Sequence, residues 1–376
     1  MKKLQLVDLK TQFERIEDEV NKAVLDVLKS TAYINGPEVK SFQSEFEKYL
    51  DVKHVIPCAN GTDALQISLM ALGLEPGDEV ISPSFTYIAT AEVIGLLRLT
   101  PVFIDVDKKN FCIDIKSLEA AITEKTKAIV PVHLYGHCAN MEEIMEVANR
   151  YGIPVIEDTA QAIGSDYTFK NGSIKKAGTI GTVGCTSFFP SKNLGCYGDG
   201  GAIMTNDDNL AAQIRMVANH GQSKRYYHDV IGVNSRLDSI QAAILRIKLR
   251  HLDEYLNARN EAANYYNEAF APFDQLETPH IDSWSNHGFH QYTLVLHNVN
   301  RDGLMDHLES KGIPANIYYP LPVHEQKSFE GRFEERVSLA NTDYLKERVM
   351  SLPMHTELDN EQLKFITDSV IEFINK

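Results

Sequence analysis

Short apolar runs alternate with amphipathic stretches from about residue 50 to residue 205, and no other feature constrains the fold as strongly. The apolar runs suit buried strands, which we expect at residues 54–59, 79–82, 101–105, 128–133, 155–157 and 184–189. The stretches between them carry apolar residues at helical spacing and predict helices at residues 62–74, 87–97, 115–122 and 141–151. This alternation predicts an α/β domain whose mostly parallel sheet lies between helices.

A different pattern follows. Residues 235–270 keep one helical period and predict a long helix that bridges two domains. Beyond it we expect one strand and two helices, at residues 291–296, 301–311 and 360–374. Because 376 residues exceed one ordinary core, we predict a large domain over residues 1–250 and a smaller C-terminal α/β domain over residues 251–376. An amphipathic helix that ends near residue 29 is expected to pack on the small domain.

Composition excludes several classes of function. The net charge of -15 is unfavourable for a nucleic-acid surface, since phosphate binding needs clustered lysines and arginines. The five cysteines include no C-x-x-C pair, so we expect neither a metal site nor a disulfide framework. Lys2 and Lys3 precede no apolar stretch typical of a signal peptide, and no run approaches membrane-spanning length. We therefore expect a cytoplasmic protein without a membrane partner.

Two polar residues at the ends of predicted strands carry the candidate chemistry. Lys192 follows one apolar run in a short polar loop, and Asp158 directly follows another. Because ligands bind beyond the carboxyl ends of parallel strands, both side chains are expected at one edge of the sheet. This pair suits pyridoxal 5′-phosphate (PLP): a lysine amine bonds to its aldehyde, and an aspartate pairs with the protonated ring nitrogen.

Each of these residues also has a purely structural interpretation. A lone lysine after a strand is usually a surface residue. Asp158, with Gln161 three residues later, fits a helix capping box. The turn at residues 60–62 also fits a strand-to-helix connection with a cap. The cofactor interpretation is favoured because Lys192 and Asp158 occur together at the predicted edge.

Several motifs carry a resemblance to one known family. They are Asn60-Gly61-Thr62-Asp63-Ala64-Leu65, Glu157-Asp158-Thr159-Ala160-Gln161, Ser187-Phe188-Phe189-Pro190-Ser191-Lys192-Asn193 and Gly198-Asp199-Gly200-Gly201-Ala202. With them the chain resembles the DegT/StrS-type sugar-nucleotide aminotransferases nearly end to end, from Asp8 to His355. The resemblance implies the PLP-dependent fold type I, which is similar to aspartate aminotransferase.

The resemblance also implies roles in a cofactor site. The residues concerned are Gly61, Thr62, Tyr87, Asp158, Gln161, Ser187, Lys192 and Asn234. Glycine at a helix start lets backbone N–H groups approach an anion, so Gly61 and Thr62 are expected at the cofactor phosphate, with the Ser187 hydroxyl. Tyr87 matches the aromatic residue that stacks on the ring, although a core aromatic is the alternative. Asn234 matches a residue donated to the neighbouring subunit, which implies a homodimer with shared active sites.

Substrate contacts follow from the same resemblance. Arg236 is expected to reach a uronate carboxylate across the subunit interface, because a guanidinium suits a carboxylate. Tyr318 and Tyr319 match the segment that contacts the sugar, although the family often has histidine in place of Tyr318. His220 begins a basic and aromatic loop that either closes over a nucleotide or stays solvated.

The implied reaction has two halves. An amino acid, with glutamate expected, loads its amine onto PLP to give pyridoxamine phosphate, which aminates a ketosugar nucleotide. The motif context is similar to UDP-2-acetamido-2-deoxy-3-oxo-glucuronate aminotransferases, which serve surface polysaccharide assembly. The alternatives are a dTDP-3-oxo-6-deoxyhexose aminotransferase and a PLP-binding regulator without catalysis. A PLP-dependent dehydratase is disfavoured, because such relatives carry histidine where Lys192 stands.

Overall fold

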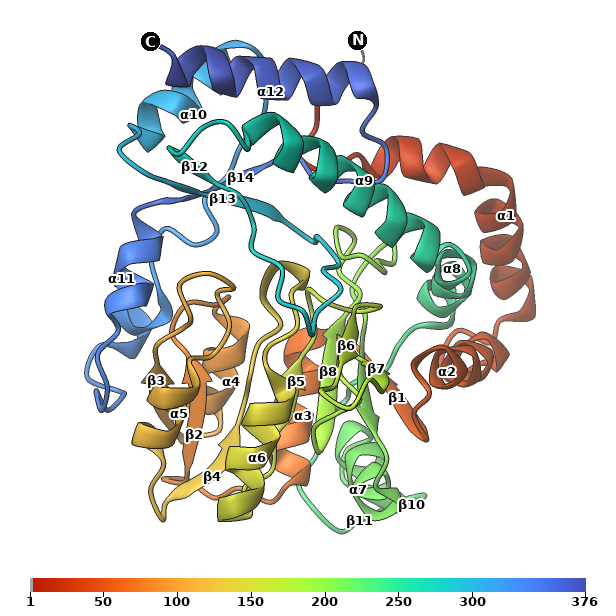
Figure 1. Ribbon diagram of the computed structural model, residues 1–376. Coiled ribbons are helices and arrows are strands. Elements are labelled where there is room, and N and C mark those ends of the chain that lie inside the picture. Colours follow the sequence, from red (N-terminus) through yellow and green to blue (C-terminus); the bar gives the residue numbers. More distant parts are fainter. Residues whose placement is uncertain (1–2) are drawn as a thin grey trace.

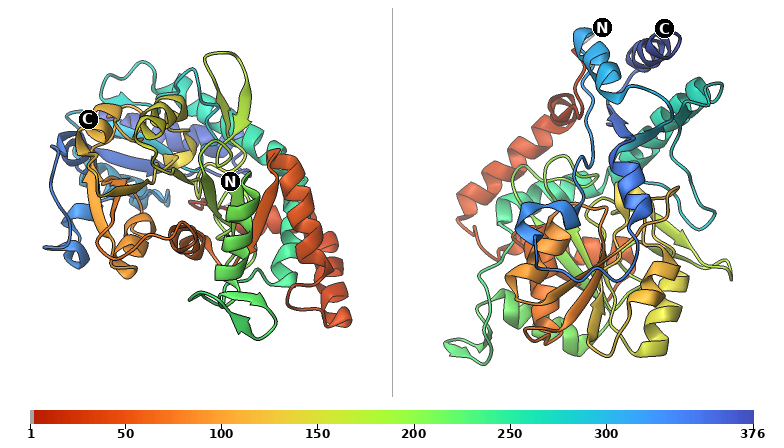
Figure 2. Two further views of the ribbon diagram at one scale, coloured as in Figure 1. Left: turned by 90° about the horizontal axis from the view of Figure 1, so that it is seen from below. Right: turned by 90° about the vertical axis from the view of Figure 1, so that its left-hand side faces the viewer.

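The computed structural model describes residues 3–376, so the basic start of the chain at Lys2 lies outside the described residues. Figure 1 shows a larger part built around a central sheet and a smaller part packed above it. The two further views in Figure 2 show the same two layers from below and from the side.

The central sheet is mixed but mostly parallel, as predicted. One segment has the order β1 (His54–Cys58), β9 (Gly201–Thr205), β8 (Val183–Ser187) and β5 (Ile156–Asp158). The other has the order β3 (Thr100–Ile104), β2 (Glu79–Pro83) and β4 (Thr126–Ile129). Parallel bridges from Ile129 to Val155 and from Val132 to Asp158 join β4 to β5. β9 runs antiparallel to both of its neighbours, β1 and β8.

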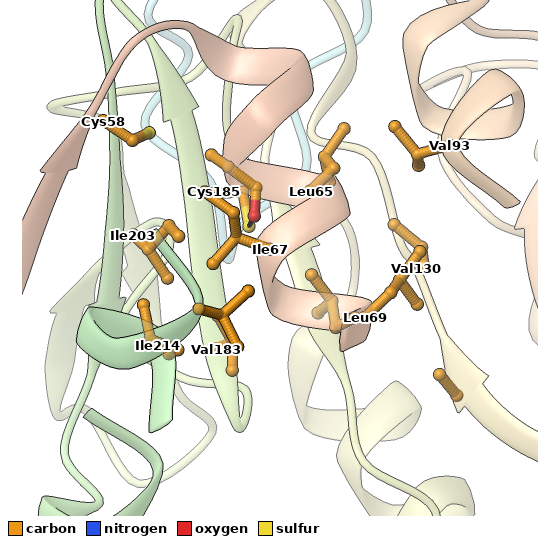
Figure 3. Close-up of a cluster of buried hydrophobic side chains, with 14 of the residues drawn as sticks. Cys58, Leu65, Ile67, Leu69, Val93, Val130, Val183, Cys185, Ile203 and Ile214 are labelled. Atoms are coloured by element: carbon orange, nitrogen blue, oxygen red, sulfur yellow. Dashed lines mark hydrogen bonds between the residues drawn. The ribbon is translucent and has the colours of Figure 1, made fainter. Parts of the chain in front are cut away.

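Helices cover both faces of this sheet. On one face α3 (Gly61–Ala71), α4 (Ala89–Leu96) and α7 (Asp208–Ala218) bury a cluster in which Leu65, Val183 and Ile203 meet (Figure 3). On the other face α5 (Ile115–Ala121) and α6 (Met141–Tyr151) pack over β2, β3 and β4. Val80 belongs to the first cluster and its neighbour Ile81 to the second, as the two-residue strand period requires.

Three differences from the predicted elements concern the site or the connection between the two parts. The strand expected at residues 128–133 ends at Ile129, because the following residues continue only through isolated bridges to β5. The helix expected from residue 87 begins at Ala89, which leaves Tyr87 in the preceding loop. The single helix expected at residues 235–270 is wrong: the structure has α8 (Ser239–Leu249) and α9 (Leu252–Phe270).

The two helices part because they pack on different partners. α8 packs on α1 (Leu9–Ser30) and on α2 (Pro37–Leu50), whereas α9 runs toward the upper part (Figure 1). His251, between them, has non-helical backbone angles, φ -102° and ψ 0°. The apolar period continues across this break, so the sequence gives no sign of it.

The smaller part has its own antiparallel sheet and core. Its three-stranded sheet has the order β12 (Leu276–Glu277), β13 (Tyr292–Leu296) and β14 (Val349–Leu352). The remaining helices are α10 (Arg301–Ser310), α11 (Ala340–Lys346) and α12 (Asn360–Ile374). Short hairpins pair β6 (Asp166–Thr168) with β7 (Ile174–Lys176) and β10 (Gln222–Lys224) with β11 (Tyr227–His228).

The predicted domain boundary near residue 250 stays a prediction, because α9 contributes to both cores. Leu252 and Leu256 pack in a cluster of the large part, whereas Tyr266 and Phe270 pack in that of the small part. The N-terminal helix was expected to pack on the small domain, but α1 packs mainly on α8 of the large part, through Ile16 and Val20. Near its start it also reaches the small part, where Gln12 Nε2 donates to Thr356 Oγ1 at 3.3 Å.

Two other expectations concern whole classes of residues. The cysteines of the described chain are all buried and free, at positions 58, 112, 138, 185 and 196. Between residues 3 and 376, none of the helices combines the length and the apolar character needed to cross a membrane.

Candidate active site

A cavity of about 710 Å³ opens beyond the carboxyl ends of β5 and β8. Segments far apart in the chain form its wall, including residues 60–65, 86–89, 158–161, 187–192, 290–291 and 318–319. Lys192 and Asp158 both line it, as do Gly61, Thr62 and Ser187. The topology therefore brings the predicted sheet-edge residues together in one enclosed space.

Asp158 is held in place by its neighbours while it faces the cavity. Thr90 Oγ1 donates a hydrogen bond to Asp158 Oδ2 at 2.7 Å, and the Ala160 N–H donates to Oδ1 at 3.1 Å. Thr90 and Ala160 thus hold both oxygens of the carboxylate, and Asp158 is almost completely buried. Each carboxylate oxygen can accept further hydrogen bonds, so Asp158 keeps the capacity to bind a ligand group.

Lys192 is an amine without a partner in the described residues. Neither a hydrogen bond nor an ion pair ties its Nζ atom to any part of the chain between residues 3 and 376. Burial lowers the pKa of Lys192 to about 8, and the negative charge of Asp158 opposes this effect. A lysine with this pKa is partly neutral near pH 8 and therefore nucleophilic.

Gln161 connects two segments of the cavity wall, one of which carries Tyr318 and Tyr319. Its Oε1 accepts a hydrogen bond from the Tyr135 N–H at 2.7 Å, and its Nε2 donates to Tyr319 Oη at 2.9 Å. Tyr135 in turn donates its hydroxyl to the carbonyl oxygen of Tyr318. Gln161, Tyr318 and Tyr319 thus share one network along the cavity wall.

The start of α3 provides a cradle for an anion. The side chain of Asn60 caps the helix through the Asp63 N–H at 2.8 Å, whereas the N–H groups of Gly61 and Thr62 donate to no described residue. A Cβ atom at Gly61 would lie only 2.7 Å from the Cβ of Ser187. Only glycine lets the helix start approach the end of β8 this closely, which suits phosphate binding.

Tyr87 borders the cavity from the loop before α4. Its side chain is 57% exposed, so the alternative of a core aromatic is wrong. Its ring centroid lies 6.2 Å from that of Tyr319. A flat cofactor ring between these elements is compatible with this placement, and ring stacking by Tyr87 stays a prediction.

Three predicted site residues lie outside the cavity of their own chain. Asn234 and Arg236 line a neighbouring hollow of about 540 Å³, which shares Asn60 and Asp199 with the cavity. Arg236 makes no hydrogen bond or ion pair within residues 3–376. His220 is exposed beside the β10–β11 hairpin, where its carbonyl oxygen contacts His228 Nδ1 at 2.8 Å.

The fold brings several residues to this site that the sequence did not indicate. Thr90, Tyr135, His290 and Gln291 belong to helix, loop and strand-flanking segments with no motif that marks them. A threonine two residues after a loop, or a histidine before a strand, is common in any α/β chain. Only spatial proximity to Asp158 and Lys192 gives these residues a role.

The residues present fit PLP. Asp158 offers a fixed carboxylate, Lys192 an unpaired amine of lowered pKa, and the α3 start a cradle that excludes a Cβ atom. All three border one cavity. The amine suits the aldehyde of that cofactor, the carboxylate suits its ring nitrogen, and the helix start suits its phosphate.

Comparisons with known proteins support this fit. The model of the DegT/DnrJ/EryC1/StrS aminotransferase family matches residues 14–371. The UDP-2-acetamido-2-deoxy-3-oxo-D-glucuronate aminotransferase of Pseudomonas aeruginosa is 46% identical over 96% of this chain and 98% of its own length. The UDP-N-acetyl-3-dehydro-alpha-D-glucosamine 3-aminotransferase of Acidithiobacillus ferrooxidans is 44% identical over 96% and 95%, respectively. A "pleiotropic regulatory protein" of Geobacillus stearothermophilus is also 44% identical, over 98% of both chains.

Solved structures agree with the fold. A DegT/DnrJ/EryC1/StrS aminotransferase from Brucella abortus superimposes with a TM-score of 0.94 at 42% identity, over 99% of this chain and 100% of the other. NtdA from Bacillus subtilis, solved with the bound cofactor PMP (pyridoxamine phosphate), gives 0.92 at 29% identity, over 100% and 86%.

Proposed function

Because the chain belongs to the DegT/DnrJ/EryC1/StrS aminotransferase family and is a PLP-dependent sugar aminotransferase, we propose that it aminates the 3-keto carbon of a UDP-linked sugar. UDP-2-acetamido-2-deoxy-3-oxo-glucuronate is the proposed acceptor and L-glutamate the proposed donor. The names of the relatives from Pseudomonas aeruginosa and Acidithiobacillus ferrooxidans support a UDP-linked 3-oxo sugar. The product would serve surface polysaccharide synthesis, and we place the enzyme in the cytoplasm.

The observation that carries this proposal is the common cavity of Lys192 and Asp158 beneath the α3 N-terminus. When bound there, PLP supplies an aldehyde for amine exchange and a ring that withdraws electrons from the reacting carbon. The residues of this chain then have separate tasks at separate atoms of the cofactor and substrate.

Asp158 and Lys192 handle the charges and protons. Thr90 and the Ala160 N–H fix the orientation of the Asp158 carboxylate, which would hold a proton on the ring nitrogen of the bound cofactor. Lys192 Nζ would carry the proton between the substrate carbon and the cofactor. Its pKa of about 8 suits this work, because both protonation states are then populated near neutral pH.

The phosphate and the ring have their own proposed contacts. The N–H groups of Gly61 and Thr62, with the Ser187 hydroxyl, would hold the cofactor phosphate. Gln161 would face the phenolic oxygen, since its amide already lies in the wall between Tyr135 and Tyr319.

The charge of the cavity supports a second copy of the chain as part of the site. Among the described lining residues, Lys192 is the one full cation, against the carboxylates of Asp63, Asp158 and Asp199. An anionic nucleotide sugar needs more positive charge than this cavity offers. We therefore propose a homodimer in which Asn234 contacts the cofactor phosphate of the partner and Arg236 the substrate carboxylate.

The remaining substrate contacts are also proposals. Tyr318 and Tyr319 line the same cavity as Lys192 and would contact the sugar. His220 and the β10–β11 hairpin would close over the nucleotide of the neighbouring site, since they lie outside the cavity of their own chain.

Replacing Arg236 by alanine tests the acceptor. We expect Arg236→Ala to lower kcat/KM more for an acidic 3-keto sugar than for a neutral one, because a desolvated carboxylate loses its partner. The extra loss corresponds to roughly 2–5 kcal/mol of activation free energy. The measurement is kcat/KM with both UDP sugars, and Arg250→Ala, an exposed arginine paired with Glu19, is the control.

Other outcomes would point elsewhere. Equal losses on both sugars would remove the uronate from the proposal. Faster turnover of a dTDP-3-oxo-6-deoxyhexose by the native enzyme would favour that acceptor. Cofactor absorbance that amino acids leave unchanged would indicate a regulator, as the name of one relative suggests.

A further inference from the structure

His290 is a buried histidine that the proposed chemistry has not used. It lies just before β13, is 4% exposed and lines the cavity together with Lys192. Its Nδ1 atom is buried and has no hydrogen-bond partner within residues 3–376. Its Nε2 atom lies 3.5 Å from the side-chain nitrogen of Gln291. A buried ring nitrogen without a partner is costly, so its retention beside a cavity indicates a ligand or a moving partner.

The backbone around His290 is fixed to the loop that carries Lys192. Asn193, the residue after Lys192, donates its side-chain N–H to the Gly288 carbonyl oxygen at 2.9 Å. On the other side, Nη1 of Arg259 in α9 donates to the Phe289 carbonyl oxygen at 3.0 Å. These two contacts set the position of the imidazole relative to Lys192, although the residues are almost a hundred positions apart.

The charges around His290 favour a neutral ring. Burial lowers the pKa of His290 well below its ordinary value, and the cations Lys192 and Arg259 lower it further. Three carboxylates line the same cavity, those of Asp63, Asp158 and Asp199, and Asp158 is engaged by Thr90 and the Ala160 N–H. A neutral imidazole has one nitrogen that accepts a hydrogen bond.

We propose that His290 Nδ1 accepts a hydrogen bond from Nζ of Lys192 whenever that amine is not bonded to the cofactor. The Nε2–H group then points to the side-chain amide of Gln291, whose oxygen and nitrogen have nearly the same shape and exchange by rotation. Lys192 has a flexible stem and no other partner in the described chain, so rotation of its side chain makes the contact. His290 is thus a positioning residue: it keeps the released amine near the substrate carbon for proton transfer.

This inference rests on the proposed role of Lys192, and one experiment separates the two. The full chain is loaded either with PLP, where Lys192 is bonded to the cofactor, or with pyridoxamine phosphate, where its amine is free. Each form is labelled with a small anhydride at a series of pH values, and the Lys192 peptide is followed by mass spectrometry. Exposed Lys175 serves as the internal reference. Labelling of Lys192 at equal rates in both forms would contradict its role, whatever the His290 variants show.

The His290 variants then test the hydrogen bond. Asparagine places an acceptor oxygen near the position of Nδ1, whereas glutamine places one near Nε2. Because an acceptor stabilises the charged ammonium, we expect His290→Gln and His290→Phe to lower the pH of half-maximal Lys192 labelling by about one unit, a tenfold change in the protonation equilibrium. His290→Asn should keep the native value.

Two results would overturn the proposal. One is an unchanged labelling pH in both His290→Gln and His290→Phe, which is what a purely structural histidine predicts. The other is a rise in that pH, which would mean that His290 acts on Lys192 as a repelling charge. Should His290→Phe fail to fold, the comparison of His290→Asn with His290→Gln decides alone.

Discussion

Two regions of this molecule each hold a lysine whose pKa is lowered by burial, but the two lysines have different surroundings. In the cavity, Lys192 faces Asp158 and open space, and burial lowers its pKa to about 8. In helix α8, Lys248 is 1% exposed, and burial lowers its pKa to about 8 as well. The Nζ atom of Lys248 lies 5.2 Å from the ring centroid of Tyr197 and has no hydrogen bond or ion pair within the described residues.

The difference shows that a lowered lysine pKa does not by itself identify a catalytic residue. Desolvation acts on both amines, since it depends only on the loss of water around the charge. What distinguishes Lys192 is a cavity with room for a ligand, a fixed carboxylate across it and a helix N-terminus beside it. Lys248 instead meets an aromatic ring, which stabilises its charge in place.

The largest expected effect separates the two lysines directly. We expect Lys192→Ala to lower kcat on the order of 10⁴–10⁶-fold and to remove the absorbance of lysine-bound cofactor, because no other amine lines the cavity among the described residues. Lys248→Met should keep both, since Lys248 does not line that cavity. Absorbance spectra and turnover of the two variants provide the measurement. Loss of cofactor absorbance in Lys248→Met alone would reverse the assignment.

Two adjacent carboxylates on β5, those of Glu157 and Asp158, differ in the same way as the two lysines. Glu157 is fully buried and satisfied: His133 Nε2 lies 2.9 Å away, and the N–H groups of Gly178, Ile180 and Gly181 donate to it. Burial alone would raise the pKa of Glu157, but His133 and these N–H groups outweigh it and hold the pKa below its ordinary value. Glu157 is therefore a structural carboxylate, whereas Asp158 keeps capacity toward the cavity.

The second prediction is an activity loss without a stability loss. Asp158→Asn should lower kcat by about 10²–10³-fold, because a fixed charge opposite the ring nitrogen is lost. Glu157→Gln should instead lower the free energy of unfolding by about 3 kcal/mol, because it breaks a buried, hydrogen-bonded pair. Steady-state kinetics and denaturant unfolding on both variants check this. An Asp158→Asn enzyme with native kcat would contradict the ring-nitrogen role.

The smallest effect concerns stability against pH. Since the folded-state pKa of Lys248 lies below its unfolded value, the unfolded chain binds more protons between pH 8 and about 10.4. The free energy of unfolding should therefore rise over that window, by up to about 3 kcal/mol from this residue. Lys248→Met should lack this part of the rise and be the more stable protein at pH 7. The measurement is the free energy of unfolding of both proteins at pH 7 and at pH 10. An equal change in both proteins between these two pH values would contradict the prediction.

Much of the fold was predictable because its signals are local. The runs that form β1, β2, β3, β5 and β8 are short, apolar and separated by amphipathic stretches, so their period identified them within a residue or two. Helix α6 and helix α12 begin and end at the predicted residues. The break between α8 and α9 was missed, because it depends on two different packing partners and not on the period of the chain itself.

The candidate site divides in the same way. Lys192, Asp158 and the turn before α3 were found because each follows a strand within a motif that the sequence displays. Thr90, His290 and Gln291 were not found, because their roles come from contacts across the sheet edge and between the two parts of the molecule. The positions of Asn234, Arg236 and His220 relative to a second subunit stay predictions.

By itself, the sequence determined the order of strands and helices and the pair of residues that suits PLP, because hydrophobic period and motif spacing are properties of neighbouring residues. Only the tertiary structure decided which of two desolvated lysines faces a cavity, that Thr90 holds Asp158, and that His290 and Gln291 line the cavity. Those choices depend on segments that lie from about fifty to about a hundred positions apart in the chain, where the free energy of packing and desolvation, and not local preference, selects the neighbours.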